Sequence, residues 1–200
     1  MTSIETLLAI TLFVVSTTIT PGPNNIMIMT SGLNYGISRS LPHLLGICFG
    51  FPLMVLAIGL GLGTLFEQYP GIHEVIKYLG IAYMLFLAWK IATSHTDVNK
   101  TRAAKPLSFI QAALFQWVNP KAWMMSAGAI ATYTSVAADA YLQALIIALT
   151  FLLLSFPCVG LWLFFGLSLK NILASETQQK YFNFGMGAVL AASVLPMLTL

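Results

Sequence analysis

The distribution of charged residues constrains this chain more than any other feature of its sequence. Long stretches contain no Asp, Glu, Lys or Arg, and several are long enough to cross a lipid bilayer, which takes about 20 apolar residues in a helix. The uncharged stretches are residues 6–38, 40–66, 106–120, 122–138, 140–169 and 181–200. The pattern predicts an all-α membrane protein with several transmembrane helices.

The overall composition supports this prediction and argues against several other classes of protein. Apolar residues make up 58% of the chain and charged residues 8%, against about a quarter charged residues in an ordinary globular domain. The net charge of +3 fits basic cytoplasmic loops, and no basic patch with interleaved aromatic residues indicates nucleic-acid binding. Cys48 and Cys158 lie in apolar runs without metal-ligand spacing, so we expect neither a metal site nor another cofactor.

Hydropathy and the positions of Gly and Pro predict six membrane spans in a single transmembrane domain over residues 1–200. The spans are expected at about residues 4–30, 41–65, 75–92, 107–134, 141–168 and 182–200. Seven basic residues fall on one side of this arrangement, namely Arg39, Lys90, Lys100, Arg102, Lys105, Lys170 and Lys180, and Lys77 falls on the other. Because basic loops remain in the cytoplasm, the loop 93–106 is expected inside and both termini outside. Five crossings remain an alternative if the fourth span does not cross completely.

Three dipeptides recur in the same order in the two halves of the chain, about 100 residues apart. Thr20-Pro21 matches Asn119-Pro120, Phe51-Pro52 matches Phe156-Pro157, and Lys77-Tyr78 matches Lys180-Tyr181. Each half contains three spans, an odd number, so the second half enters the membrane the other way up. The sequence therefore predicts two inverted three-helix repeats, over about residues 1–95 and 105–200, an arrangement found in transporters.

The first and fourth spans are each expected to break near the middle. Span one contains Thr20-Pro21-Gly22-Pro23-Asn24-Asn25, and span four contains Gln116-Trp117-Val118-Asn119-Pro120-Lys121. Proline interrupts the helical hydrogen bonds that precede it, and Asn or Thr before proline favours the start of a new helix. Irregular backbone at this depth is tolerated only where protein or a water-filled cavity satisfies it. The two segments therefore predict one central polar site.

Several side chains are candidates for this site. The helices that restart at the breaks should bring their N-termini to the centre, each equivalent to about half a positive charge. Lys121 is expected there too, and a charge inside a membrane usually has a function. The candidate substrate-binding residues are Thr20, Pro21, Gly22, Pro23, Asn24, Asn25, Gln116, Asn119, Pro120 and Lys121.

A second group of residues is expected to form a gate or pocket wall, with packing alone as the alternative. The members of this group are Pro52, Tyr83, Trp117 and Pro157. For Asn24 and Asn25 the alternative is helix capping alone. His43 is expected at the cytoplasmic interface, and a proton relay is its alternative role.

Taken together, these motifs resemble the LysE/RhtB family of bacterial amino-acid exporters. The resemblance rests on Thr20 to Asn25, on Gly80 to Ser94 and on Phe109 to Lys121, and it extends over essentially the whole chain. It implies a multi-pass protein of the bacterial inner membrane that exports amino acids. The Pro-Gly-Pro-Asn-Asn form and the segment Leu87 to Ser94 are most similar to the branch that exports cysteine and O-acetylserine.

The residues themselves favour a small neutral amino acid as the substrate. A positive central site suits a carboxylate, whereas a second positive charge on the ligand would meet no buried counter-ion. All six acidic residues fall at span ends or in loops, namely Glu5, Glu67, Glu74, Asp97, Asp139 and Glu176. The expected substrates are cysteine, O-acetylserine, homoserine or threonine, exported by alternating access. Without a phosphate-binding loop or an ATPase domain, the proton is the expected coupling ion, and an oligomer is compatible with the sequence.

Two other classes of function remain as alternatives. A passive channel for small polar solutes could also be built from half-helices that meet near the midplane, and saturable, proton-coupled flux would exclude it. A membrane-embedded enzyme would need paired acids, a metal-ligand set or a nucleophile with a base. The predicted spans contain none of these arrangements.

Overall fold

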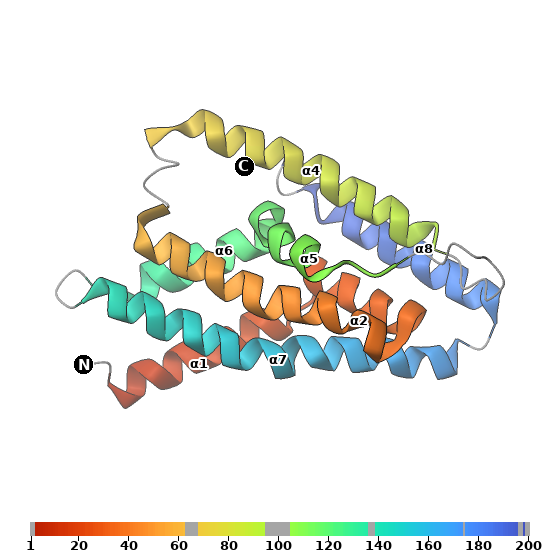
Figure 1. Ribbon diagram of the computed structural model, residues 1–200, viewed down its shortest axis with the longest axis horizontal. Helices are drawn as coiled ribbons and strands as arrows, with labels where there is room; N and C mark the ends of the chain where they lie inside the picture. The colour runs from red at the N-terminus through yellow and green to blue at the C-terminus, as the bar shows by residue number, and fades with distance from the viewer. Residues whose placement is uncertain are drawn as a thin grey trace.

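The computed structural model describes residues 3–62, 68–94, 105–135, 139–173, 175–195 and 198, and the regular secondary structure of this part is helical throughout. The α-helices are α1 (Ile4–Ile19), α2 (Pro23–Ala57), α4 (Pro70–Ala92), α5 (Phe109–Phe115), α6 (Pro120–Tyr133), α7 (Ala140–Ile172) and α8 (Glu176–Ala192). A π-helical turn, η1 (Ile58–Leu62), follows α2, and a 3-10 turn, η2 (Gln116–Val118), follows α5. Together they form an elongated bundle (Figure 1). The expected all-α fold is confirmed.

The first expected span is broken where the sequence predicts it. Helix α1 ends at Ile19 and α2 begins at Pro23. With 16 residues, α1 is about 24 Å long, too short to cross a hydrocarbon core of about 30 Å alone. In Figure 1 α1 runs from the N-terminus to the middle of the bundle, and the first part of α2 continues towards the opposite end.

Helix α2 turns back at Gly36, which divides it into an N-terminal leg (23–35) and a C-terminal leg (37–57). Gly36 has a φ of 75°, a conformation that glycine adopts without steric cost. The hydroxyls of Ser31 and Ser40 are hydrogen-bonded at 2.7 Å across the turn. The sequence analysis placed a connection between residues 30 and 41; the helices instead extend up to the turn, because one glycine reverses the chain without a polar loop.

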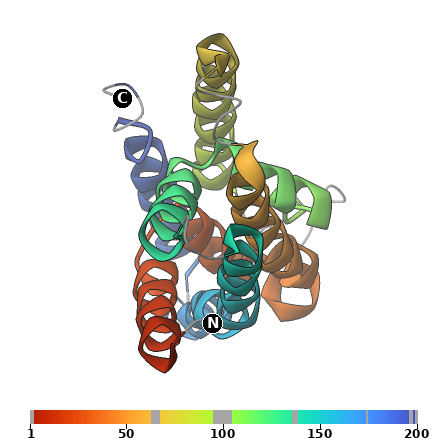
Figure 2. The same ribbon diagram turned by 90° about the vertical axis from the view of Figure 1, so that its left-hand side faces the viewer.

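The second half of the chain also departs from the expected boundaries. Helix α5, the η2 turn and α6 form the second broken segment, and α6 begins at Pro120 as predicted. Helix α5 lies obliquely to the bundle axis, as Figures 1 and 2 show. Helix α8 begins at Glu176, earlier than the expected residue 182, because Ser175 and Gln178 form a capping box there.

Three helical stretches in the described part are long and apolar enough to cross a membrane, namely Pro23–Leu62, Glu74–Ala92 and Ala140–Lys170. The stretches Ile4–Ile19 and Phe109–Val118 are shorter apolar helices. These are the segments that precede the two breaks. Most of the expected cytoplasmic loop 93–106, including Lys100 and Arg102, lies outside the described residues.

Five of the seven described basic residues gather towards one end of the bundle. The turn at Gly36, the C-terminal ends of α4 and α7 and the start of α8 all lie at the right-hand end in Figure 1. Those elements carry Arg39, Lys90, Lys170 and Lys180, and Lys105 lies in the segment that leads from that end to α5. We call this the basic end. Lys77, near the start of α4, lies towards the other end.

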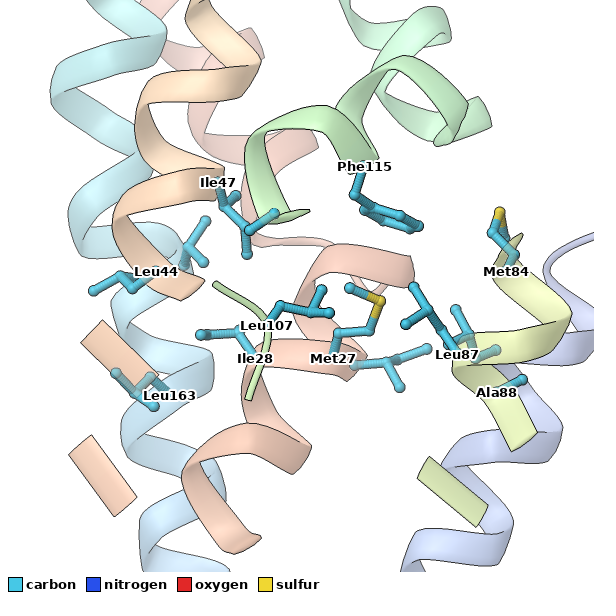
Figure 3. Packing of buried hydrophobic residues seen from close by; sticks show 14 of the residues in the cluster. Met27, Ile28, Leu44, Ile47, Met84, Leu87, Ala88, Leu107, Phe115 and Leu163 are labelled. Carbon is cyan, nitrogen blue, oxygen red and sulfur yellow. The ribbon is translucent and has the colours of Figure 1, made fainter. Parts of the chain in front are cut away.

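Two clusters of buried apolar side chains hold the helices together. The first joins both legs of α2 to α4, α5 and α7, and Figure 3 shows Met27 and Ile28 of the N-terminal leg at its centre. Its members include Leu44, Ile47, Met84, Leu87, Leu107, Phe115 and Leu163. The second joins α1, the C-terminal leg of α2, α6 and α7, and includes Ile10, Val14, Phe51, Met54, Ala122, Ile147 and Phe151.

Gly166 of α7 allows a close approach to α2, because a Cβ atom at this position would collide with the backbone carbonyl of Met29. Small residues at such contacts are typical of packed membrane helices. We expect Gly166→Ala to lower the free energy of unfolding by about 1–3 kcal/mol, since the helices must separate. Thermal unfolding of the purified protein in detergent measures this.

Gly160→Ala is the matched control, since a Cβ atom at Gly160 of the same helix meets nothing within 4 Å. It should leave the thermal transition unchanged or raise it, because alanine favours a helix over glycine. Equal destabilisation by both substitutions would contradict this packing.

Candidate substrate site at the meeting of the broken helices

Helix α1 ends midway along the bundle, where Ile19, Thr20 and Pro21 are exposed on its surface. Within a membrane, its last carbonyl groups must find donors other than its own backbone. Side chains from three elements supply them. The Thr20 hydroxyl donates to the carbonyl of Thr17 at 2.8 Å, the Asn25 amide donates to those of Thr18 and Thr20 at 2.8 Å each, and the Trp162 indole donates to that of Ile19 at 3.0 Å. The carbonyl groups freed by the break are therefore paired by side chains of the protein itself.

Lys121 completes this set from the other half of the chain. Its ammonium group donates to the Thr20 carbonyl at 2.6 Å, to the Thr20 hydroxyl at 2.8 Å and to the Pro21 carbonyl at 3.3 Å. All three donors of the ammonium are thus engaged, and the cation lies at the negative end of the α1 dipole. Because Lys121 belongs to the first turn of α6, it joins the two broken helices directly.

Gly22 leaves the space through which the Lys121 side chain passes. A Cβ atom at Gly22 would lie 2.6 Å from Cδ of Lys121, well inside contact distance. Because the neighbour is a flexible side chain, a larger residue there would displace the lysine before it disturbed the backbone. Glycine at this position therefore allows Lys121 of α6 to reach the end of α1.

A second polar contact joins the two motifs. The Asn24 amide donates to the Gln116 side-chain oxygen at 2.8 Å, and the Gln116 amide donates back to Asn24 at 3.2 Å. Gln116 is fully buried and also donates to the carbonyl of Ala112 at 2.8 Å. A buried amide pair of this kind fixes the relative position of the two segments, since either partner alone would leave polar atoms unpaired.

The N-termini of α2 and α6 differ in how they are capped. The Asn119 side chain accepts a hydrogen bond from the Lys121 backbone at 3.2 Å, so the first turn of α6 has the cap that the sequence predicts. The N-cap of α2 is Gly22, which offers no side-chain cap, and Pro23 has no N–H group. The Asn24 and Asn25 backbone N–H groups therefore provide the N-terminus better suited to an anion.

A cavity of about 370 Å³ lies beside these contacts, between the two apolar clusters. Five of the candidate substrate-binding residues line it, namely Gly22, Asn24, Asn25, Asn119 and Lys121. The other five lie next to it. Thr20 and Pro21 hold the ammonium of Lys121, Gln116 pairs with Asn24, and Pro23 and Pro120 are the first residues of α2 and α6. The structure thus brings both motifs to one place.

Three polar residues on the cavity wall were not foreseen in the sequence analysis: Thr17, Thr18 and Ser155. The hydroxyl of Thr18 is buried without a hydrogen-bond partner in the described part of the molecule. Both threonines lie within one helical turn of the break, so helical periodicity before Pro21 could have indicated them. Ser155 reaches the site through the packing of α7, and no local signal marks it.

The four residues expected at a gate or pocket wall do not line this cavity. Tyr83 packs between Phe86 and Phe115, with ring centres 6.3 and 6.2 Å away. Trp117 packs edge-on against Trp123 at 6.2 Å, and the Trp123 indole donates to the Trp117 carbonyl at 2.8 Å. Pro52 is buried within α2, whereas Pro157 is exposed on α7. The ring contacts of Tyr83 and Trp117 are of the kind that packing residues make.

Apolar helices with two breaks that meet at a cavity with polar residues on its wall are typical of membrane transport proteins. The LysE type translocator family matches residues 15–196, and the chain belongs to this family. Membership makes it a multi-pass protein of the bacterial inner membrane and a translocator, not an enzyme, as the resemblance of its motifs implied.

The curated relatives match part of the chain. The cysteine/O-acetylserine efflux proteins of Escherichia coli strain K12 and of Shigella flexneri are each 36% identical to it over 118 residues, and that of Escherichia coli O1:K1 is 35% identical over the same length. Each match covers 58% of this chain and 60% of the relative, less than two thirds of its length. No solved structure matches the chain.

The pairing of Asn24 with Gln116 can be tested by cross-linking. In a Cys48→Ala, Cys158→Ala background, we expect cysteines at positions 24 and 116 to be joined by a short bifunctional thiol reagent, because the native side chains are in hydrogen-bond contact. Mass spectrometry of the digested protein would detect the linked peptides.

The control pairs position 24 with a cysteine in place of Leu114, whose side chain is exposed on α5. It should give no link with the same reagent. Equal yields from both pairs, or no link in either, would contradict the observed meeting of the two motifs.

Proposed function

We propose that this protein exports small neutral amino acids or their derivatives from the cytoplasm, by alternating access and coupled to protons. Cysteine and O-acetylserine are the first candidates, because the relatives are named for their efflux. The observation that carries the proposal is the central cavity, where Lys121 and the start of α2 meet and where no Asp or Glu of the described residues lines the wall.

The substrate carboxylate supplies the negative charge that the cavity wall lacks. The bond from Lys121 to the Pro21 carbonyl is the longest of its three at 3.3 Å, so a carboxylate replaces it with the least disturbance. The Asn24 and Asn25 backbone N–H groups provide further donors. A hydrogen bond to a charged group contributes about 1.5–3 kcal/mol, enough to favour a carboxylate over a neutral carbonyl.

The hydroxyl oxygens of Thr17, Thr18 and Ser155 are suited to hold the single ammonium group of the substrate. Thr18 contributes most, since its hydroxyl has no partner among the described residues. A second cation, as in lysine or arginine, would meet no carboxylate on the wall and would lose its hydration without compensation. This favours neutral amino acids over dibasic ones.

Alternating access follows from two inverted repeats within one domain. We propose that α1 with the N-terminal leg of α2, and α5 with α6, are the equivalent broken crossings, giving six crossings in total. The packing supports this equivalence. The proposed repeat partners contact each other, α4 with α8 and α2 with α7. In addition, the first helix of each half packs on the long helix of the other half, α1 on α7 and α5 on α2. Rocking of one repeat against the other would open the shared cavity to each side in turn.

The orientation follows from the basic end, which we propose to be cytoplasmic. In intact cells, a cysteine at Ser38, exposed beside the turn of α2, should resist an impermeant thiol reagent, whereas one at Tyr69, exposed at the other end before α4, should react. Disrupted cells should label both. Labelling at position 38 but not at position 69 in intact cells would reverse the orientation.

Lys121 is the residue on which the mechanism depends most. In inverted membrane vesicles, we expect uptake of radiolabelled cysteine or O-acetylserine to be saturable and to require a pH gradient, whereas a passive channel would show neither property. Lys121→Met should reduce the rate by about 10- to 100-fold, the equivalent of losing about 1.5–3 kcal/mol. Gly22→Ala should reduce it less, by displacing the lysine side chain.

Lys180→Met, at an exposed position on α8, is the matched control and should transport normally. Membrane levels of each variant are measured alongside the rates. A Lys121→Met protein that inserts normally and transports at the wild-type rate would overturn the role of Lys121.

A further inference from the structure

A second cavity, of about 430 Å³, lies at the basic end. It is enclosed by both legs of α2 next to the Gly36 turn, by the last turns of α4 and by the segment before α5. Its polar wall includes Ser31, Asn34, His43, Lys90, Ser94 and Lys105. None of these residues belongs to the central site.

His43 is the unusual member of this wall. Only 2% of its surface is exposed, and neither ring nitrogen has a hydrogen-bond partner in the described part of the molecule. The sequence analysis placed this side chain at the membrane interface; the structure buries it on the wall of a cavity that the last turns of α4 and the segment before α5 also line. A buried polar group without a partner costs about 1–3 kcal/mol, so its position on a cavity wall indicates that an occupant of the cavity satisfies it.

The charges around this cavity favour an anionic group in the occupant. Lys90 and Lys105 both line it, and no Asp or Glu does so among the described residues. The neutral polar groups are engaged elsewhere: Asn34 pairs with Asn183 at 3.1 and 3.0 Å, and Ser31 pairs with Ser40. The Lys90 ammonium lies 6.0 Å from the centre of the Phe86 ring, a weak contact because that ring is exposed. Among the described residues, the two ammonium groups and the imidazole of His43 are therefore the groups that a ligand would meet.

We infer that this cavity is a cytoplasmic receiving site, where the carboxylate of the amino acid binds between Lys90, Lys105 and His43 before the molecule moves to the central site. The inference rests on the proposed function and adds a second binding step to it. A carboxylate matches the donors here, since two ammonium groups and an imidazole N–H can each donate to its oxygens.

The two sites share one structural element. Met27 and Thr30 of the N-terminal α2 leg line the receiving cavity, and the first turn of the same leg lines the central one. The Met27 side chain lies in the core below Phe115, as Figure 3 shows. Methionine has a flexible, unbranched side chain, so rotation of Met27 can open a path between the sites with little disturbance of the helices.

Transport measured from the cytoplasmic side tests this inference. In inverted vesicles, the double variant Lys90→Gln, Lys105→Gln should raise the KM for radiolabelled cysteine or O-acetylserine about tenfold, or about 1.4 kcal/mol, and leave the maximal rate within about twofold. His43→Gln should raise KM in the same direction. The control, Lys170→Gln with Lys180→Gln, removes the same charge from exposed positions at the same end and should behave as wild type.

Carboxylate recognition is tested with cysteine methyl ester, which keeps the ammonium and side chain but lacks the anion. The ester should compete poorly with cysteine in wild-type vesicles, and the double variant should discriminate less between the two compounds. An ester that competes as well as cysteine in the wild type, or a KM in the double variant equal to that of its control, would overturn the receiving site.

Equilibrium binding to purified protein in lipid nanodiscs separates this inference from the proposed function. If the wild type binds neither radiolabelled probe, both are contradicted. If the wild type binds and transports while the double variant matches its control and His43→Gln matches the wild type, the receiving site alone is contradicted and the central site stands.

Discussion

The unpaired carbonyl groups at the end of α1 are the constraint on which the rest of the structure depends. Two prolines and a glycine stop the helix midway along the bundle, at a depth in the membrane where water cannot pair its backbone at low cost. Asn25, Trp162 and Lys121 therefore converge on these carbonyls from α2, α7 and α6. Closing the break thus brings together both halves of the chain, and the same contacts that satisfy the backbone form one wall of the central cavity.

The segment from Thr20 to Asn25 has two roles: it closes the C-terminal end of α1, and it leaves the N-terminus of α2 available to a ligand. Lys121 and Asn25 stabilise the C-terminal end of α1. The backbone N–H groups at the start of α2 have no side-chain cap, because the N-cap residue is Gly22. Apolar clusters on either side hold the helices in place, and the cavity lies between them. A site held in this way can exchange one lysine contact for a ligand without losing the packing around it.

The sequence predicts the features that depend on local chemistry. Pro21 and Pro23 fix the first break, and Asn119-Pro120 fixes the second together with its cap. A reversal of the chain between residues 30 and 41 could be predicted, but its tightness at Gly36 could not, because the polar residues around it, such as Asn34, Ser38 and Arg39, are equally typical of a longer loop. The burial of His43 and the contact of Lys121 with the Thr20 carbonyl depend on helices distant in the sequence, so only their packing reveals them.

The most direct test of the central site is a distance measured by solid-state NMR in the membrane. The two atoms are the isotope-labelled carboxylate carbon of bound cysteine or O-acetylserine and the Nζ atom of Lys121. If the amino acid binds where the broken helices meet, this distance should be within about 4 Å, the range of an ion pair, and the coupling should disappear in Lys121→Met. A saturated complex without that coupling in the wild-type protein would show that the carboxylate binds elsewhere, and the account of the central site would be wrong.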